Sequence, residues 1–162
     1  MNRAPNVATP IVTAPPHNGT NLVSSTSERC SGLPTWKLHF KSGPSDVYRA
    51  LSTPGGRSRY WADAPETDAT IHFTAPGGDT ADVRIEEATL DRRYRISWES
   101  GRLLTFDLAP SETGGTDLTV SGVTGPHLSD DVAILMRLKA WVDFGVDLRN
   151  HDENRRTGYL DH

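Results

Sequence analysis

The feature that most constrains the fold is one long segment of helical period near the end of the chain, from Ser129 to about Leu148. A helix of about 20 residues, rising roughly 1.5 Å per residue, is about 30 Å long and can cross a whole small sheet. Ser129, Asp130 and Asp131 lie at its start, where negative charge suits the helix dipole. Its apolar residues recur at spacings of three and four: Ile134, Leu138, Trp141, Gly145 and Leu148, with Leu135, Val142 and Val146 beside them. Such a stripe has to be buried against another apolar surface.

That surface is expected from segments that alternate apolar and polar residues, because a period of two is typical of strands with one buried face. The predicted inner faces of six strands carry Trp36, Leu38 and Phe40; Ile71 and Phe73; Val83, Ile85, Ala88 and Leu90; Tyr94, Ile96 and Trp98; Leu104, Phe106 and Leu108; and Leu118 and Val120. The alternation slips by one residue at Glu86–Glu87, which predicts a β-bulge that bends the strand. Because the loops are short, neighbouring strands are expected to pair antiparallel.

Two short helices are predicted between the first and second strands. Ser42–Ser45 offers a hydroxyl cap to the first, which carries Val47, Tyr48 and Leu51. Pro54–Gly56 is expected to break it, and a second helix is predicted near Arg57–Ala62. The fold class is therefore α+β: a curved six-stranded antiparallel sheet around a long C-terminal helix, with two short helices between strands 1 and 2.

The rest of the chain lacks a periodic pattern. Residues 1–33 are rich in Pro, Thr, Asn, Ser and Ala, and cannot bury enough apolar surface to offset the entropy of ordering. We therefore predict a disordered N-terminal tail over 1–33, one domain over 34–155 and a polar C-terminal tail over 156–162.

Composition excludes several classes of partner and location. The net charge of −4 leaves no basic footprint for nucleic acid. No apolar run reaches the roughly 18 residues of a membrane span, and the N-terminus lacks the apolar run of a secretory signal. A single cysteine, Cys30, excludes an internal disulfide framework. A cytoplasmic protein is the simplest interpretation.

Motifs for phosphate binding or for a serine nucleophile are absent from the sequence. The histidines at 17, 39, 72 and 127 are scattered over different predicted elements. Asp147 and His151 are four residues apart, but one histidine at a helix end favours capping and surface ion pairs over a metal site. Neither a metal nor a cofactor is expected.

Several segments resemble a known superfamily. The order of predicted elements resembles the START-like, helix-grip superfamily, also called SRPBCC, over roughly residues 35–155. Within it, Asp46–Pro54 followed by Arg59–Trp61 resembles the opening of the family homologous to the C-terminal domain of heat-shock-protein-90 ATPase activators. Leu104–Leu108 with Gly115–Val120 resembles its paired late strands. Trp141–His151 resembles the end of the helix in one bacterial subgroup.

The resemblance implies a domain that binds an apolar small molecule or lipid-like ligand between the sheet and the C-terminal helix. The candidate wall residues are large, apolar and on predicted inner faces: Trp61, Tyr94, Trp98, Phe106, Met136 and Trp141. Ordinary core packing would use the same residue types. Glu87, at the slip in alternation, could point inward as a polar cavity residue, or outward on the bulge.

Two other functions stay open. One is a protein-interaction module with a chaperone partner, although the resembling activators carry a separate N-terminal domain that the predicted tail does not match. The second is a cyclase, dehydratase or hydrolase in the same cavity, with Glu87 or His72 as acid–base group. The sequence also departs from the family at Ala64–Thr67, where a Gly-aromatic pair is common.

Overall fold

The computed structural model describes residues 35–74, 80–123 and 125–151. The predicted tails over 1–33 and 156–162 lie outside them. The described elements, in chain order, are β1 (Thr35–Phe40), α1 (Pro44–Ser52), α2 (Pro54–Arg57), β2 (Glu66–Thr67), β3 (Thr70–Thr74), β4 (Thr80–Thr89), β5 (Arg93–Trp98), β6 (Leu103–Pro110), β7 (Thr116–Ser121), the 3₁₀ helix η1 (Gly125–His127) and α3 (Leu128–Phe144).

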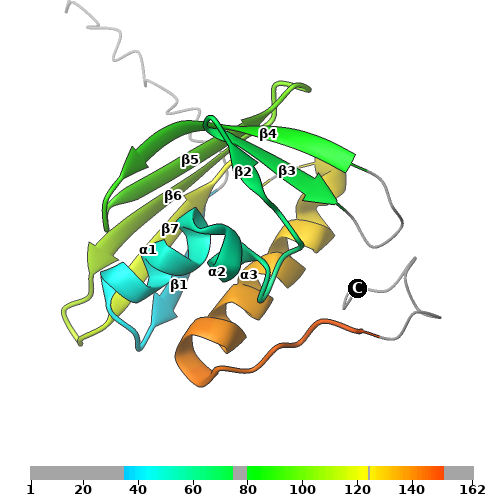
Figure 1. Ribbon diagram of the computed structural model, residues 1–162. Coiled ribbons are helices and arrows are strands. Elements are labelled where there is room, and N and C mark those ends of the chain that lie inside the picture. The colour runs from blue at the N-terminus through cyan, green and yellow to red at the C-terminus, as the bar shows by residue number, and fades with distance from the viewer. Residues whose placement is uncertain (1–34, 75–79, 124, 152–162) are drawn as a thin grey trace, which may run out of the picture. The chain divides into compact units, whose positions relative to one another are not determined.

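All the strands belong to one antiparallel sheet with the order β1-β7-β6-β5-β4-β3-β2. Six of them are the predicted strands, and β2 adds a seventh of two residues that the sequence pattern did not reveal. Figure 1 shows α3 along the concave side of the sheet, with α1 and α2 on that same side. The predicted α+β helix-grip architecture is therefore confirmed.

The predicted bulge lies in β4. Ile85 faces Ile96 across the ladder, but the next paired residue, Glu87, faces Arg95, so one residue is inserted between them. An extra residue on one strand bends that strand and increases its twist. The bulge therefore helps the sheet curve around α3.

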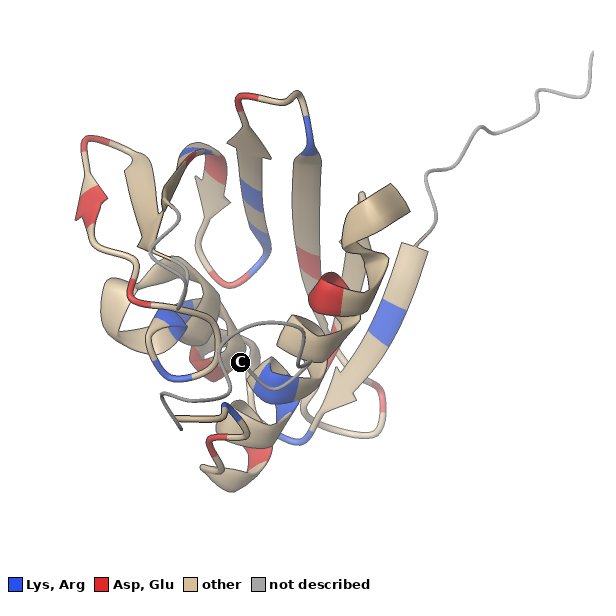
Figure 2. Ribbon diagram, turned by 90° about the vertical axis from the view of Figure 1, so that its right-hand side faces the viewer, with Lys and Arg blue, Asp and Glu red and all other residues tan. Residues whose placement is uncertain are grey.

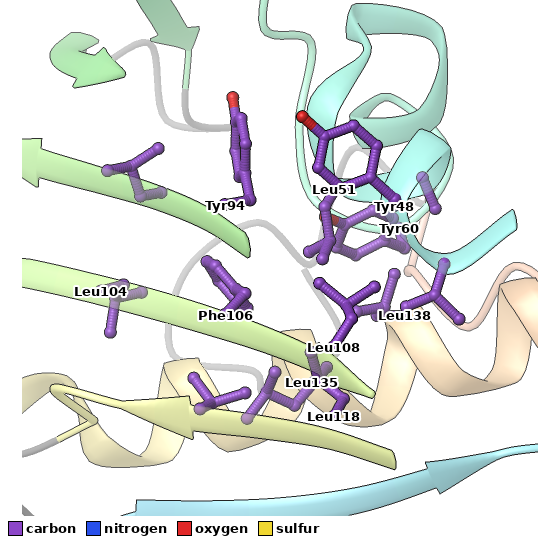
Figure 3. Packing of buried hydrophobic residues seen from close by; sticks show 14 of the residues in the cluster. Tyr48, Leu51, Tyr60, Tyr94, Leu104, Phe106, Leu108, Leu118, Leu135 and Leu138 are labelled. Atoms are coloured by element: carbon purple, nitrogen blue, oxygen red, sulfur yellow. The ribbon is translucent and has the colours of Figure 1, made fainter. Parts of the chain in front are cut away.

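The core lies where the inner face of the sheet meets the helices. Figure 3 shows Leu104 and Phe106 of β6 and Leu118 of β7 on the side of the strands toward α3, which contributes Leu135 and Leu138. Phe40, Val83, Ile96, Leu118 and Val120 are fully buried, as the alternation predicts. Each large apolar side chain buried this way contributes roughly 1.5–3 kcal/mol.

The helix α2 begins earlier than predicted. Pro54 occupies the first turn, where its missing N–H costs no hydrogen bond, and the Thr53 hydroxyl accepts from the Gly56 N–H. Gly56 also lies so close to α1 that a Cβ there would stand 2.6 Å from the Ala50 carbonyl oxygen. The Pro-Gly-Gly sequence thus forms the second helix instead of breaking the first.

The caps of the other helices also differ from the prediction. Gly43 caps α1 without a side-chain hydrogen bond, because glycine has no side chain. The Ser42 hydroxyl points instead to α3, where its proton is shared between the Val142 carbonyl oxygen at 3.1 Å and the Asp143 carboxylate at 3.2 Å. The helix α3 ends at Phe144, not near Leu148, because Gly145 adopts a left-handed conformation with φ of 67°. Glycine tolerates this conformation without a Cβ clash.

Candidate functional site

A narrow apolar crevice lies between the sheet and the first half of α3. It leaves room of only about 10 Å³, close to the space that one water molecule needs. Its lining residues are mostly apolar and come from β6, β7, α3 and the segment after α2: Trp61, Leu104, Phe106, Val120, Val123, Asp131, Ile134 and Leu135. The side chains in this part of the wedge therefore fill it almost completely.

Two predicted wall residues, Trp61 and Phe106, do line this crevice. Phe106 is buried on β6 with 3% of its surface exposed. Trp61 is only half-buried and packs against the core through its ring, whose centroid lies 4.6 Å from that of Phe73. The two lining residues therefore differ, since Phe106 belongs to the sheet and Trp61 is a partly exposed side chain on a loop.

Asp131 is the one charged residue in the lining. Its side chain is 4% exposed, and its Oδ1 accepts a hydrogen bond from Nη2 of Arg102 in the β5–β6 turn. Its Oδ2 and the Arg102 Nε are both buried and have no hydrogen-bond partner in the described part of the chain. Burial raises the pKa of the Asp131 carboxyl above its usual range, and the hydrogen bond and charge of Arg102 act in the opposite direction.

The predicted wall residue Trp98 contacts this pair but does not line the crevice. The Arg102 guanidinium lies over the Trp98 ring, 4.3 Å from its centroid. A cation at this distance is attracted to the negative face of the ring. Trp98 thus holds Arg102 in the position from which it reaches Asp131.

Tyr94 has a different role from the predicted one. Its hydroxyl accepts a hydrogen bond of 3.3 Å from Nη1 of Arg57, whose side chain is fully buried. Arg57 also donates to the Leu51 and Ala64 carbonyl oxygens and, at 2.8 Å, to Glu66. Burial raises the pKa of Tyr94 to about 12, so its phenol stays protonated at neutral pH. Tyr94 therefore joins the sheet to α1, α2 and β2 and does not line the crevice.

Trp141 lines a second hollow, an open surface groove of about 430 Å³ between the two short helices and the last turns of α3. The Arg59 guanidinium lies 5.4 Å from its ring centroid. Other polar groups in the groove are already bonded: Asp46 pairs with Arg49 at 2.6 Å, and the Thr53 hydroxyl donates to the Arg49 carbonyl oxygen. The groove has the volume of a ligand site but lacks the enclosure that buries most of a ligand.

Met136 does not lie on the inner side of α3. Its side chain is 46% exposed, while its neighbours Leu135 and Leu138 are buried. A helix turns by about 100° per residue, so a residue next to the stripe leaves it readily. The expectation that Met136 faces a cavity is not met.

Glu87 and His72 lie on the outer face of the sheet. Glu87 faces Arg95 across the ladder, accepts a hydrogen bond from the Thr89 hydroxyl and lies 3.9 Å from Arg93. Nδ1 of His72 lies 2.8 Å from the Asp82 carboxylate. Neither can act on a molecule in the crevice, because the sheet separates them from it.

Asp143 lies at the other end of α3 and its side chain is fully buried. It accepts hydrogen bonds from the backbone N–H groups of Lys41 and Ser42, from the Ser42 hydroxyl and from Lys139. Burial alone would raise its pKa, but these hydrogen bonds outweigh burial and hold the pKa below its usual range. Asp143 thus fastens the end of α3 to the loop after β1.

The predicted cluster beyond α3 is a local ion pair. Asp147 accepts hydrogen bonds from the Arg149 side chain and backbone, and His151 lies 3.2 Å from it. The Arg149 hydrogen bond holds the pKa of Asp147 well below its usual range. Within the described ranges, no three His, Cys, Asp or Glu side chains gather in a group that could hold a metal ion.

Sequence reasoning missed the Arg102–Asp131 pair. The position of Asp131 at the start of the helix predicts an interaction with the helix dipole, yet Asp131 also precedes Ile134, Leu135 and Leu138 by three, four and seven residues. It therefore occupies a position in the apolar stripe of α3. A carboxylate at such a position is the signal that could have identified it.

Surface charge shows no preference for one sign. Figure 2 shows basic and acidic residues interspersed along the strands and helices of the described chain. None of the described helices combines the length and the hydropathy that crossing a membrane requires.

Comparison with known proteins shows the fold but not the activity. No protein-family model matches the sequence, and a search of curated proteins finds no match. Among solved structures, protein SSP2350 of Staphylococcus saprophyticus is similar with a TM-score of 0.60 and 19% identity, over 71% of this chain and 94% of that one. The Aha1 dimer of Colwellia psychrerythraea is similar with a TM-score of 0.58 and 19% identity, over 68% of this chain and 96% of that one. Protein CV1439 of Chromobacterium violaceum is similar with a TM-score of 0.54 and 21% identity, over 69% of this chain and 98% of that one.

The described domain therefore shares its helix-grip fold with these structures, and this is the fold that the sequence predicts. One fold of this kind hosts many functions, so the function has to be argued from the site.

Proposed function

We propose that this protein binds a compact apolar molecule in the crevice between the sheet and α3. The observation that carries the proposal is Asp131, a buried carboxylate with an oxygen that has no partner in the described structure, in an otherwise apolar lining. Leaving a buried polar atom unpaired costs about 1–3 kcal/mol. Such a cost within a well-packed core is typical of functional sites.

Binding requires the crevice to widen, because about 10 Å³ does not hold an organic ring. Trp61 is the lining residue best placed to move, because it is large, half-buried and follows the turn after α2. If its indole rotates outward, the ligand takes its place against Phe106 and Leu135. The energy of this opening lowers the apparent affinity, since only the open fraction of the protein binds.

The experiment measures naphthalene binding to the native chain by calorimetry, together with Trp61→Ala and the control Trp36→Ala on the edge strand. Native protein is expected to bind, Trp61→Ala to bind at least about tenfold more tightly because no indole must be displaced, and Trp36→Ala to bind like the native chain. Trp61→Phe serves if the alanine variant does not fold. Binding to Trp61→Ala but not to the native chain would refute the proposal, because the substitution alone would have created the cavity.

The movement of Trp61 can be followed separately. In a chain with Trp36, Trp98 and Trp141 replaced by Phe, the remaining tryptophan fluorescence reports on Trp61 alone. Acrylamide is expected to quench this fluorescence more strongly when naphthalene is bound. Unchanged quenching at saturation would show that the ligand binds without displacing the indole.

A second candidate function is a protein-interaction module. Phe144, Val146 and Leu148 are 60%, 46% and 49% exposed in the segment where α3 ends. Clustered exposed apolar side chains are typical of interaction sites, and one similar structure is that of an Aha1 dimer. We would test whether the native chain changes the ATPase rate of a heat-shock-protein-90 chaperone, and whether replacing all three residues by Ser removes the change. No change with the native chain would exclude this partner.

A further inference from the structure

Asp131 lines the proposed site, and its hydrogen-bond partner Arg102 lies beside it; each side chain keeps one free polar atom, and the two atoms are complementary. The Asp131 Oδ2 is a hydrogen-bond acceptor and the Arg102 Nε–H is a donor. Both atoms are buried and neither has a partner among the described residues, although their own side chains are joined through Oδ1 and Nη2. The side chains are 4% and 19% exposed, so Asp131 is shielded from water, while Arg102 keeps partial access to water outside its buried Nε. A bound group able to accept one hydrogen bond and donate another would satisfy both.

The charges of the pair limit what that group can be. A carboxylate on the ligand would be repelled by the negative charge of Asp131, and an ammonium would be repelled by the positive charge of Arg102. The net charge of the Arg102–Asp131 pair is close to zero. The other charged groups that act on Asp131, His127 and Asp130, are exposed and have opposite effects on it. In a site shielded from water, unbalanced like charges are costly. A neutral polar group avoids both repulsions.

We infer that the ligand is an apolar molecule carrying a neutral hydroxyl or carboxamide, which donates to the Asp131 Oδ2 and accepts from the Arg102 Nε–H. This inference rests on the proposed function of the crevice. Without the ligand, the available 10 Å³ is close to the space that one water molecule needs. The hydroxyl of the ligand then takes this space, and the apolar body takes the place of the Trp61 indole against Phe106.

The test uses four probes with one ring system and different head groups, titrated into the full native chain at pH 7. They are naphthalene, 2-naphthalenemethanol, 2-naphthoate and 2-naphthylmethylammonium. The alcohol is expected to bind about tenfold more tightly than naphthalene, because it gains hydrogen bonds to charged groups. Both ions are expected to bind more weakly than naphthalene. Equal binding of the alcohol and naphthalene, or tightest binding of either ion, would overturn the inference.

In the variant Asp131→Asn, the order of affinity for the alcohol and naphthoate is expected to reverse. The substitution keeps the shape of the side chain but leaves Arg102 without its negative partner. Naphthoate is then expected to bind at least about tenfold more tightly than to the native chain, and to exceed the alcohol. The matched control is Asp130→Asn, an exposed neighbour at which the native order of the four probes should persist. An unchanged order in Asp131→Asn would show that Asp131 does not contact the head group.

These results separate the two proposals. If no probe, including naphthalene, binds the native chain, the proposed function is wrong. If naphthalene binds but the head group has no effect in native protein or in Asp131→Asn, the crevice is a ligand site and only the inference about the head group is wrong.

Discussion

Two buried carboxylates on one helix, Asp131 and Asp143, differ sharply in how they are satisfied. Both side chains are almost completely buried. Asp143 accepts hydrogen bonds from two backbone N–H groups, a hydroxyl and an ammonium. Asp131 has Arg102 alone, and its second oxygen has no partner in the described part of the chain. Their pKa values accordingly move in opposite directions from the ordinary value.

The difference distinguishes a structural role for Asp143 from the functional role that we propose for Asp131. A fully bonded buried carboxylate stabilises the fold, because its hydrogen bonds offset the loss of hydration. A partly bonded one costs stability and retains the capacity to bind another group. The C-terminal end of α3 is therefore an anchor, and the N-terminal end is the place to look for a ligand.

The largest expected effect follows from Asp143→Ala. This change leaves the Lys41 and Ser42 N–H groups and Lys139 without their shared acceptor. We expect the free energy of unfolding to fall by about 3 kcal/mol, measured by urea denaturation. Asp46→Ala, which removes an exposed i,i+3 ion pair, is the control and should cost less than about 0.5 kcal/mol. A loss below about 1 kcal/mol at Asp143 would contradict its role as an anchor.

A smaller effect is expected from Asp131→Asn. The substitution removes a buried charge that has little compensation, while Arg102 keeps some access to water. We expect a change in the free energy of unfolding of less than about 1 kcal/mol at pH 7. The same urea measurement tests it beside Asp143→Asn, which should be more destabilised. If the two variants lose equal stability, the contrast between the two ends of α3 does not hold.

The smallest expected effect is on how the free energy of unfolding depends on pH. Because the pKa of Asp143 is lowered by folding, its contribution is present at neutral pH and is lost as the pH falls below about 4. Because the pKa of Asp131 is raised by folding, the cost of its ionised form is relieved as the pH falls through that raised value. Asp143→Asn should therefore flatten the acid loss of stability and Asp131→Asn should steepen it, in urea titrations between about pH 3 and 7. Slopes that change in the same direction would contradict these signs.

Structural features that depend on local periodicity can be predicted well from the sequence. The inner faces around Ile96, Phe106 and Leu118, the bulge at Glu86–Glu87 and the helical stripe as far as Trp141 are confirmed. These features follow from residues close together in the chain, whose burial pattern repeats with the period of the element.

The candidate site was harder to predict because it depends on residues distant in sequence. Arg102 and Asp131 are 29 residues apart, and Arg57 reaches Tyr94 across 37. No local pattern indicates that either pair will meet. Periodicity also cannot distinguish a core residue such as Tyr94 from a wall residue such as Trp61, since both face inward. Only Trp61 and Phe106 of the predicted wall line the crevice.

The position of β1 beside β7 has a consequence for synthesis of the chain. His39 meets Asp117 across 78 residues, and the Lys41 backbone reaches Asp143 across 102. During translation β1 emerges first but has neither its ladder partner nor its anchor until almost the whole domain has left the ribosome. Closure of such a long loop is slow, which is why non-local strand pairing delays folding. A nascent chain stopped before β7 should therefore leave its first strand open to proteases and chaperones, although β3 to β6 can already pair as hairpins.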